Sequence, residues 1–163
     1  MLFFVAIATS GFSQNHNNEN DKFSHRQSIQ AELFGHGLLY SINYEYVLIN
    51  QQKFKTAAQV GISYYPPTTS YIPIWIPIGI NEIISFGKHH LEVGIGQVIT
   101  TEMGHNLYGE EERDWEPFLS GRLGYRYQQA GGRLVVRAGL TPLFEYGPKD
   151  LHLSGALTVG YCF

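Results

Sequence analysis

The stretch Leu151–Phe163, with the sequence LHLSGALTVGYCF, decides how the rest of the chain is interpreted. Its larger apolar residues occupy every second position, and small or polar residues occupy most of the positions between them. This period of two predicts a β-strand with one apolar face. The strand ends the sequence on an aromatic residue, Phe163. An apolar strand face at the end of a chain needs something apolar to contact, because it is unfavourable to leave it in water.

The composition favours a barrel whose strands alternate between lipid-facing and lumen-facing residues. Charged residues make up 15% of the 163 residues, below the roughly 25% usual for soluble domains. Aromatic residues reach 14%, and no apolar run after the N-terminus approaches the ~20 residues of a membrane-spanning helix. The net charge of −3 predicts no nucleic-acid partner. The single cysteine, Cys162, precludes an internal disulfide.

The first 27 residues divide into an apolar and a polar segment. Residues 1–14 (MLFFVAIATSGFSQ) are predicted to be a secretory signal peptide, although no Lys or Arg precedes their apolar core. A buried first strand is the alternative interpretation of this segment. Residues 15–27 are polar without periodicity and are predicted to form a flexible linker. His16 and His25 lie in that linker, where a solvated tail is favoured over a metal site.

From residue 28 onward, the alternation predicts eight strands. Each has nine residues or more, and about 9–11 residues suffice for a tilted strand to cross a bilayer. An open sheet would leave unpaired edges in lipid, so the sheet is expected to close. The predicted fold is therefore all-β, an eight-stranded antiparallel up-and-down transmembrane β-barrel. The predicted strands are 28–36, 39–48, 54–65, 72–86, 90–101, 117–128, 133–143 and 151–163.

The fourth strand is the least regular of the eight. Pro77 interrupts it, and the alternation slips between Glu82 and Ile84. A proline loses a ladder hydrogen bond, and a β-bulge would accommodate both features. We therefore predict a bulge in this strand.

Aromatic residues are predicted to form one belt at each end of the barrel, because aromatic rings prefer membrane interfaces. The belt at the end with short turns comprises Tyr46, Phe54, Phe86, Tyr127, Tyr161 and Phe163. The opposite belt comprises Tyr40, Tyr64, Tyr71, Phe118 and Phe144.

The last seven residues, LTVGYCF, resemble the C-terminal insertion signal of outer-membrane β-barrels. That signal has apolar residues at alternate positions before a terminal aromatic residue, as Leu157, Val159, Tyr161 and Phe163 have here. Over residues 28–163, the chain is similar to the small eight-stranded outer-membrane proteins of the OmpA and OmpX kind, in pattern rather than through a shared motif. The resemblance implies insertion by the outer-membrane assembly machinery of a Gram-negative bacterium, and contact with membrane lipids and lipopolysaccharide. It implies little about activity.

The same alternation places three acids and three arginines on the lumen side of the strands. An eight-stranded interior is just wide enough to be filled by side chains, and buried charges are costly unless they pair. We predict an ion-pair network that plugs the barrel and leaves no sizeable pore. The alternative is that these side chains reach water at the barrel ends as independent charges. The six residues are Glu32, Glu45, Glu92, Arg122, Arg126 and Arg137.

The longest predicted loop, Glu102–Glu116, contains the acidic sequence GEEERDWE. Carboxylate oxygens are preferred calcium ligands, but this loop lacks the spacing of a known calcium-binding loop. We predict instead a solvated loop that is displayed to surface partners. Its interaction residues are Glu110, Glu111, Glu112, Asp114 and Trp115.

The predicted function is a structural or surface-interaction role without catalytic residues, cofactors or metals. Three alternatives stay open: a narrow channel, a soluble ligand-binding barrel of the lipocalin type, and an outer-membrane lipid-modifying or proteolytic enzyme. A lipocalin-like barrel would place its larger apolar residues inside. An enzyme would group reactive residues at the rim, where Glu102, His105, His152 and Ser154 are expected, but no spacing among them demands a catalytic triad.

Overall fold

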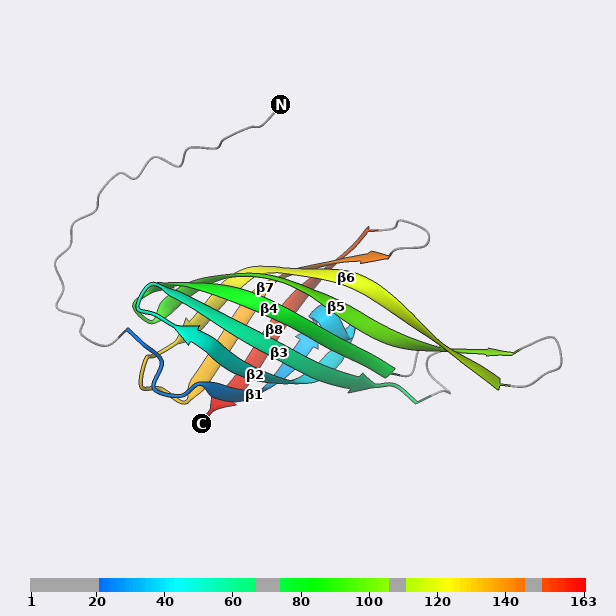
Figure 1. Ribbon diagram of the computed structural model, residues 1–163, viewed down its shortest axis with the longest axis horizontal. Helices are drawn as coiled ribbons and strands as arrows, with labels where there is room; N and C mark the ends of the chain where they lie inside the picture. The colour runs from blue at the N-terminus through cyan, green and yellow to red at the C-terminus, as the bar shows by residue number, and fades with distance from the viewer. Residues whose placement is uncertain (1–20, 67–73, 106–110, 146–150) are drawn as a thin grey trace, which may run out of the picture.

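The eight strands form one closed antiparallel barrel in which each strand pairs with its sequence neighbours (Figure 1). This computed structural model describes residues 21–66, 74–105, 111–145 and 151–163, with the backbone alone for residues 102–105 and 111–116. The ladder between the first and last strands runs from Ser28–Cys162 to Phe34–Ala156 and closes the barrel. The predicted eight-stranded antiparallel up-and-down barrel is thus confirmed. The elements are β1 (Gln27–Phe34), the 3-10 turn η1 (Gly35–Gly37), β2 (Tyr40–Asn50), β3 (Phe54–Tyr64), β4 (Ile74–Phe86), β5 (His89–His105), β6 (Glu111–Gln128), β7 (Leu134–Glu145) and β8 (Leu151–Cys162).

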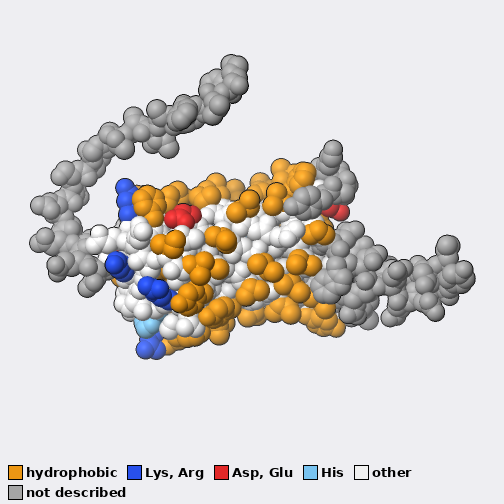
Figure 2. All heavy atoms as spheres, in the orientation of Figure 1, with side chains coloured by type: hydrophobic (Ala, Val, Ile, Leu, Met, Phe, Trp, Pro, Cys, Tyr) orange, Lys and Arg blue, Asp and Glu red, His pale blue; other side chains and the backbone are white. Residues whose placement is uncertain are grey.

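The outward face of the barrel is apolar and its lumen is mostly polar. Outward-facing residues such as Ile29, Leu123 and Val159 expose about half of their surface (53%, 52% and 54%). Apolar side chains are spread along the visible flank in Figure 2, and its charged side chains lie mainly toward the ends. This is the reverse of the arrangement expected for a lipocalin-like barrel. Within the described residues, no helix is long and apolar enough to cross a membrane.

The two ends of the barrel differ in their connections. At one end, which we call the terminal end, lie the start of β1, the end of β8 and the short connections β2–β3, β4–β5 and β6–β7 (Figure 1). The β4–β5 turn has only two residues, and Gly87 supplies the positive φ of +70° that its geometry requires. Exposed cations gather at this end, at the left of Figure 2: Lys22, Arg26, Lys53, Lys88 and Arg133. The opposite end, which we call the loop end, carries η1.

The predicted bulge in the fourth strand was wrong. The ladder between β4 and β5 runs without a shift from Ile74–Thr101 to Phe86–His89. Pro77 interrupts only the ladder with β3, which resumes in the same register on both sides. The apparent slip arises because Glu82 faces outward, where it accepts a hydrogen bond of 2.8 Å from Thr56 Oγ1, while Ile83 packs inside. The register shift in the described sheet lies instead in β2, between Val47 and Ile49.

One predicted belt residue also lies elsewhere. Phe118 faces the lumen and is 8% exposed, so it does not belong to the aromatic belt at the loop end. The alternation of β6, in which Leu119 and Leu123 face outward, fixes this direction. Tyr40 and Tyr64 lie on the outward face near that end, and Tyr71 falls outside the described residues.

The short β1–β2 connection folds into the barrel instead of extending from it. All three residues of η1 are buried. The reversal places Phe34 and Leu38 at positive φ angles of 60° and 64°, which are costly for residues with side chains. The Tyr65 hydroxyl offsets this cost, because it donates to the Gly37 carbonyl and accepts a hydrogen bond of 2.9 Å from the Leu39 amide. The backbone of η1 therefore occupies part of the lumen at the loop end.

Candidate functional site

The middle of the lumen contains a cluster of four charged side chains from β2, β5, β6 and β7. Arg126 donates two hydrogen bonds to the carboxylate of Glu45, at 3.1 and 2.8 Å. Arg137 also donates to Glu45 and, at 2.9 Å, to Glu92. The second oxygen of Glu92 lies 3.5 Å from Arg126. Each carboxylate thus faces two guanidinium groups, so neither charge is left uncompensated.

The remaining two predicted members form a second cluster nearer the loop end. Glu32 pairs with Arg122 and accepts a hydrogen bond of 3.1 Å from Thr158 Oγ1. It also accepts one of 3.1 Å from the backbone amide of His36 in η1. The Nδ1 atom of His36 lies 2.8 Å from Arg122. The inward fold of η1 is therefore held by the charges of the lumen.

A long ion pair connects the two clusters. Arg122 Nε lies 3.9 Å from Glu92, and all six predicted residues lie together in the lumen. None of the six is more than 6% exposed. Removing one partner from a buried ion pair costs about 3–5 kcal/mol, because the other charge stays buried without compensation. We call these six residues the lumen network.

A small cavity lies beside the lumen network. Its volume is about 10 Å³, and its lining includes Glu92, Arg122, Arg137 and Thr158. This is the space that one water molecule needs. The Nε atoms of both arginines lack a hydrogen-bond acceptor within the described protein, so a water molecule here would meet polar groups that need a partner.

The terminal end of the lumen is filled by Phe23, which precedes β1. Its ring lies 4.7 Å from Lys55 Nζ, and it packs edge-on against His90 with the ring centroids 5.2 Å apart. The backbone of Phe23 is held by Asn50, whose side-chain amide donates at 2.8 Å and accepts at 3.0 Å. Residues 15–20 of the predicted linker lie outside the described residues. The following residues, 21–26, lie against this end of the barrel, with an amide of Ser24 bonded to the carbonyl of Ala130 at 2.7 Å.

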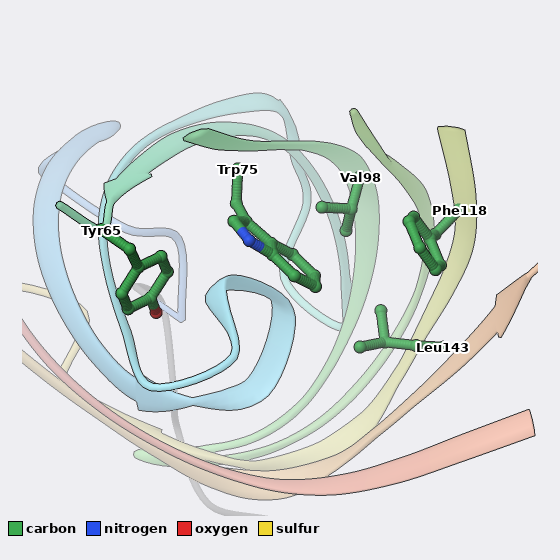
Figure 3. Close-up of a cluster of buried hydrophobic side chains, with 5 residues drawn as sticks. All are labelled: Tyr65, Trp75, Val98, Phe118 and Leu143. Atoms are coloured by element: carbon green, nitrogen blue, oxygen red, sulfur yellow. The ribbon is translucent and has the colours of Figure 1, made fainter. Parts of the chain in front are cut away.

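The loop end of the lumen has a different chemistry, because apolar side chains replace the charges. The rings of Trp75 and Phe118 stack with their centroids 5.9 Å apart. Figure 3 shows these rings and their neighbours pointing into the barrel above the inward turn. We call this cluster the apolar layer; its members are Tyr65, Trp75, Val98, Phe118 and Leu143.

The predicted long acidic loop was wrong in its extent. β5 continues to His105 and β6 begins at Glu111, so residues 102–105 pair with residues 111–114 in a β-ladder. Glu111, Glu112, Asp114 and Trp115 are therefore strand residues, and Glu110 lies outside the described residues. The two strands run past the rest of the barrel at its loop end (Figure 1).

Three of the residues that resemble an insertion signal lie on the outward face of β8, and the fourth, Phe163, follows the strand directly. Leu157, Val159, Tyr161 and Phe163 are each about half exposed. The backbone amide of Phe163 donates to the carbonyl of Gln27 at 2.9 Å, so the last residue is part of the barrel closure. Cys162 faces inward and is buried beside Gln128.

Of the four candidates for rim chemistry, the structure describes the side chains of His152 and Ser154. Ser154 Oγ donates to a neighbouring carbonyl and accepts from the amide of Gly35, and no base among the described residues is bonded to it. Glu102 and His105 lie in β5. Among the described side chains, no group of three or more His, Cys, Asp or Glu residues is placed to hold a metal ion.

Sequence reasoning missed three lumen residues: Phe23, His36 and Lys55. Phe23 stood in a polar segment without periodicity, and His36 stood in an expected turn, so neither gave a signal. Lys55 could have been found, because the alternation that puts Ala58 and Val60 outward puts Lys55 inward.

Known proteins resemble this chain in structure alone. No family model and no curated protein matches the sequence. The N-terminal β-barrel domain of Pseudomonas aeruginosa OprF is similar with a TM-score of 0.58 and 16% identity, over 87% of this chain and 99% of that one. Ail of Yersinia pestis, in complex with the heparin analogue sucrose octasulfate, is similar with a TM-score of 0.53 and 11% identity, over 87% of this chain and 97% of that one. At these identities, the likeness shows a shared barrel fold.

Proposed function

We propose that this chain is an outer-membrane protein with a structural or surface-interaction role, and that its lumen is closed to solutes. The observation that carries the proposal is the pairing of an apolar outward face with a lumen of balanced charges. In water, the first arrangement would expose a large apolar surface. In a bilayer, closed barrels satisfy every strand edge and keep polar groups inside.

The proposed orientation puts the terminal end in the periplasm and the loop end outside the cell. Outer-membrane barrels have short periplasmic turns and longer outer connections. Cations and aromatic rings occur together at the terminal end, where Arg133 lies 5.7 Å from the ring of Tyr161 and Lys53 lies 5.9 Å from that of Phe54. Such groups suit a membrane interface. Outer-membrane lipids and lipopolysaccharide would contact the outward face, and the assembly machinery would recognise β8.

The proposed closure of the lumen rests on three stacked obstructions. Phe23 fills the terminal end, the lumen network spans the middle, and η1 lies above it. The cavity beside Glu92 and Arg122 has room for one water molecule and no more. This favours a closed barrel over the narrow-channel alternative.

The proposed surface for partners is the hairpin formed by the ends of β5 and β6. Residues 102–116 contain six acids and one arginine. A partner with positive charge is favoured, because like charges repel when surfaces meet. A sulfated polyanion, such as the analogue bound to Ail, is therefore a poor candidate for this hairpin. We also propose that the protein is not an enzyme, because the Ser154 hydroxyl is bonded to two backbone groups, the carbonyl of Gly155 and the amide of Gly35.

Cell fractionation, combined with heat-modifiable migration on a gel, tests the proposed location. We expect the protein in the outer membrane, with different mobility in unheated and boiled samples. Phe163→Ser should lower its recovery there by reducing recognition of β8, whereas Phe86→Ser, which changes an aromatic residue of the same belt, should not. Recovery as a soluble periplasmic protein without a mobility shift would overturn the proposal.

A further inference from the structure

The barrel wall has an incomplete seam at the loop end. The ladder between β7 and β8 continues to Phe144–Leu151, whereas the ladder between β1 and β8 ends at Phe34–Ala156. Within the described chain, residues 151–155 of β8 therefore have a strand on one side only. The missing neighbour is the start of the β1–β2 connection, which has folded inward as η1. A backbone edge is thus left open between β8 and the barrel interior.

A pocket of about 440 Å³ lies at this seam. Its lining includes residues from three parts of the chain: Leu38, which follows η1, Trp75 from β4, and Leu153 from β8. Leu38 and Leu153 are 46% and 65% exposed, so the apolar outward face continues into the pocket mouth. The volume lies within the range of about 300–1,000 Å³ that is typical of small-molecule sites.

The pocket is apolar on one side and polar on the other. Trp75, Phe118 and Leu143 belong to the apolar layer, while Glu145, His152 and Ser154 are polar. The polar side provides both hydrogen-bond donors and acceptors. It contains one carboxylate and one imidazole, not several groups of the same charge, so it suits an uncharged polar group. Four residues deeper along the same face of β6 lies Arg122, a member of the lumen network.

We propose that this pocket binds a single-chain amphiphile with one uncharged hydrogen-bonding end, such as a long-chain alcohol. The alkyl chain lies against Trp75, Phe118 and Leu143, and the polar end meets Glu145, His152 and Ser154. The ligand enters sideways through the seam, because the mouth is continuous with the lipid-facing surface. Among the described residues, a hydrogen bond of 3.2 Å from the Gly35 amide to Ser154 Oγ crosses the seam, and a single bond of this kind adds little net stability.

Fluorescence quenching of Trp75 tests this proposal directly. The chain has two tryptophans, so Trp115→Phe leaves Trp75 as the only indole. The full-length variant is placed in phosphatidylcholine vesicles and titrated with 11-bromoundecanol, whose bromine quenches an adjacent indole. We expect saturable quenching that unbrominated undecanol reverses by competition. 1-Bromoundecane, which lacks the hydroxyl, should bind more weakly.

Two substitutions on β7 separate the pocket from the surrounding lipid. Leu143→Phe fills the pocket and should weaken binding about tenfold, since added bulk removes room for the chain. Leu140→Phe makes the same change on the outward face and should leave the titration unchanged. Heat-modifiable migration checks that both variants fold.

Three results would overturn the proposal. Quenching that rises without saturation and resists competition by undecanol would show partition into the bilayer alone. Equal titrations for Leu143→Phe and Leu140→Phe would place the ligand elsewhere. Equally tight binding of 1-bromoundecane would show that the pocket does not recognise the hydroxyl group. The competition experiment needs no change to the pocket, so it decides the matter even if Leu143→Phe does not fold.

Discussion

The middle of the lumen is filled by charged side chains, whereas its loop end is lined by apolar side chains. In the middle, the lumen network fills the barrel with six charged side chains that are almost completely buried. At the loop end, the apolar layer lines the wall and leaves a pocket of about 440 Å³. Removing one charged side chain from the network leaves its partner buried without compensation, which costs much stability. Removing an apolar side chain from the layer costs only the contacts of the atoms removed. The middle should therefore govern stability and the loop end should be free to bind.

Arg126→Leu should produce the largest effect in this comparison. The change removes the two-pronged contact with Glu45 and leaves buried carboxylates with less compensation. We expect a loss of about 3–5 kcal/mol in the free energy of unfolding, measured by urea denaturation in vesicles.

The matched control is Arg133→Leu, because Arg133 is exposed in the β6–β7 connection. Its loss should cost less than about 1 kcal/mol, as is usual for surface charges. Equal losses in the free energy of unfolding for the two variants would mean that the lumen network contributes no more to stability than a surface charge does.

Glu45→Leu should cost less stability in the Arg126→Leu variant than in the unmodified protein. The double variant no longer buries the orphaned carboxylate, and Arg137 keeps its contact of 2.9 Å with Glu92. We expect the double variant to be more stable than the sum of the two single losses predicts, by about 1–3 kcal/mol in a double-mutant cycle. Strictly additive losses would contradict a coupled network.

Leu143→Ala should cost less than Arg126→Leu. The residue belongs to the apolar layer but borders the pocket, so part of its surface has no close neighbour to lose. We expect about 2 kcal/mol, the low end for a buried leucine, in the same urea titration. A loss equal to that of Arg126→Leu would contradict the contrast between the two regions.

Among the substitutions inside the lumen, Phe23→Ala should have the smallest effect on global unfolding, because residues 21–26 precede β1 and belong to no strand of the barrel. The ring contributes about 1 kcal/mol through its cation–π contact with Lys55. We expect faster amide hydrogen exchange at Ser24, whose amide is bonded to Ala130, with little change inside β6. Slow exchange at Ser24 in the variant would show that Phe23 does not anchor this segment.

Much of this architecture could be predicted from the sequence, because a strand with one apolar face has apolar residues at every second position. That rule located the eight strands and assigned the six residues of the lumen network to the lumen side, although Lys55 was missed. It failed where no face is apolar: consecutive charges near Glu111 looked like a loop, although the backbone there continues β6. It also failed in β4, where Glu82 faces outward against the rule.

The remaining features depend on contacts between distant residues. The inward direction of η1 follows from hydrogen bonds with Glu32 and Tyr65, and no local pattern encodes it. The docking of Phe23 follows from Lys55 and His90, which lie far along the chain. The seam and its pocket exist only because η1 leaves β8 without a neighbour. Local periodicity therefore predicts the wall of the barrel, and only the assembled structure explains what fills it.

The most direct test of the central claim is single-channel conductance of the full-length protein in a planar bilayer. A barrel closed by Phe23, the lumen network and η1 should insert without producing stable current steps. Reproducible, discrete openings in the unmodified protein would contradict the claim, because they would require a continuous path of water past the buried ion pairs.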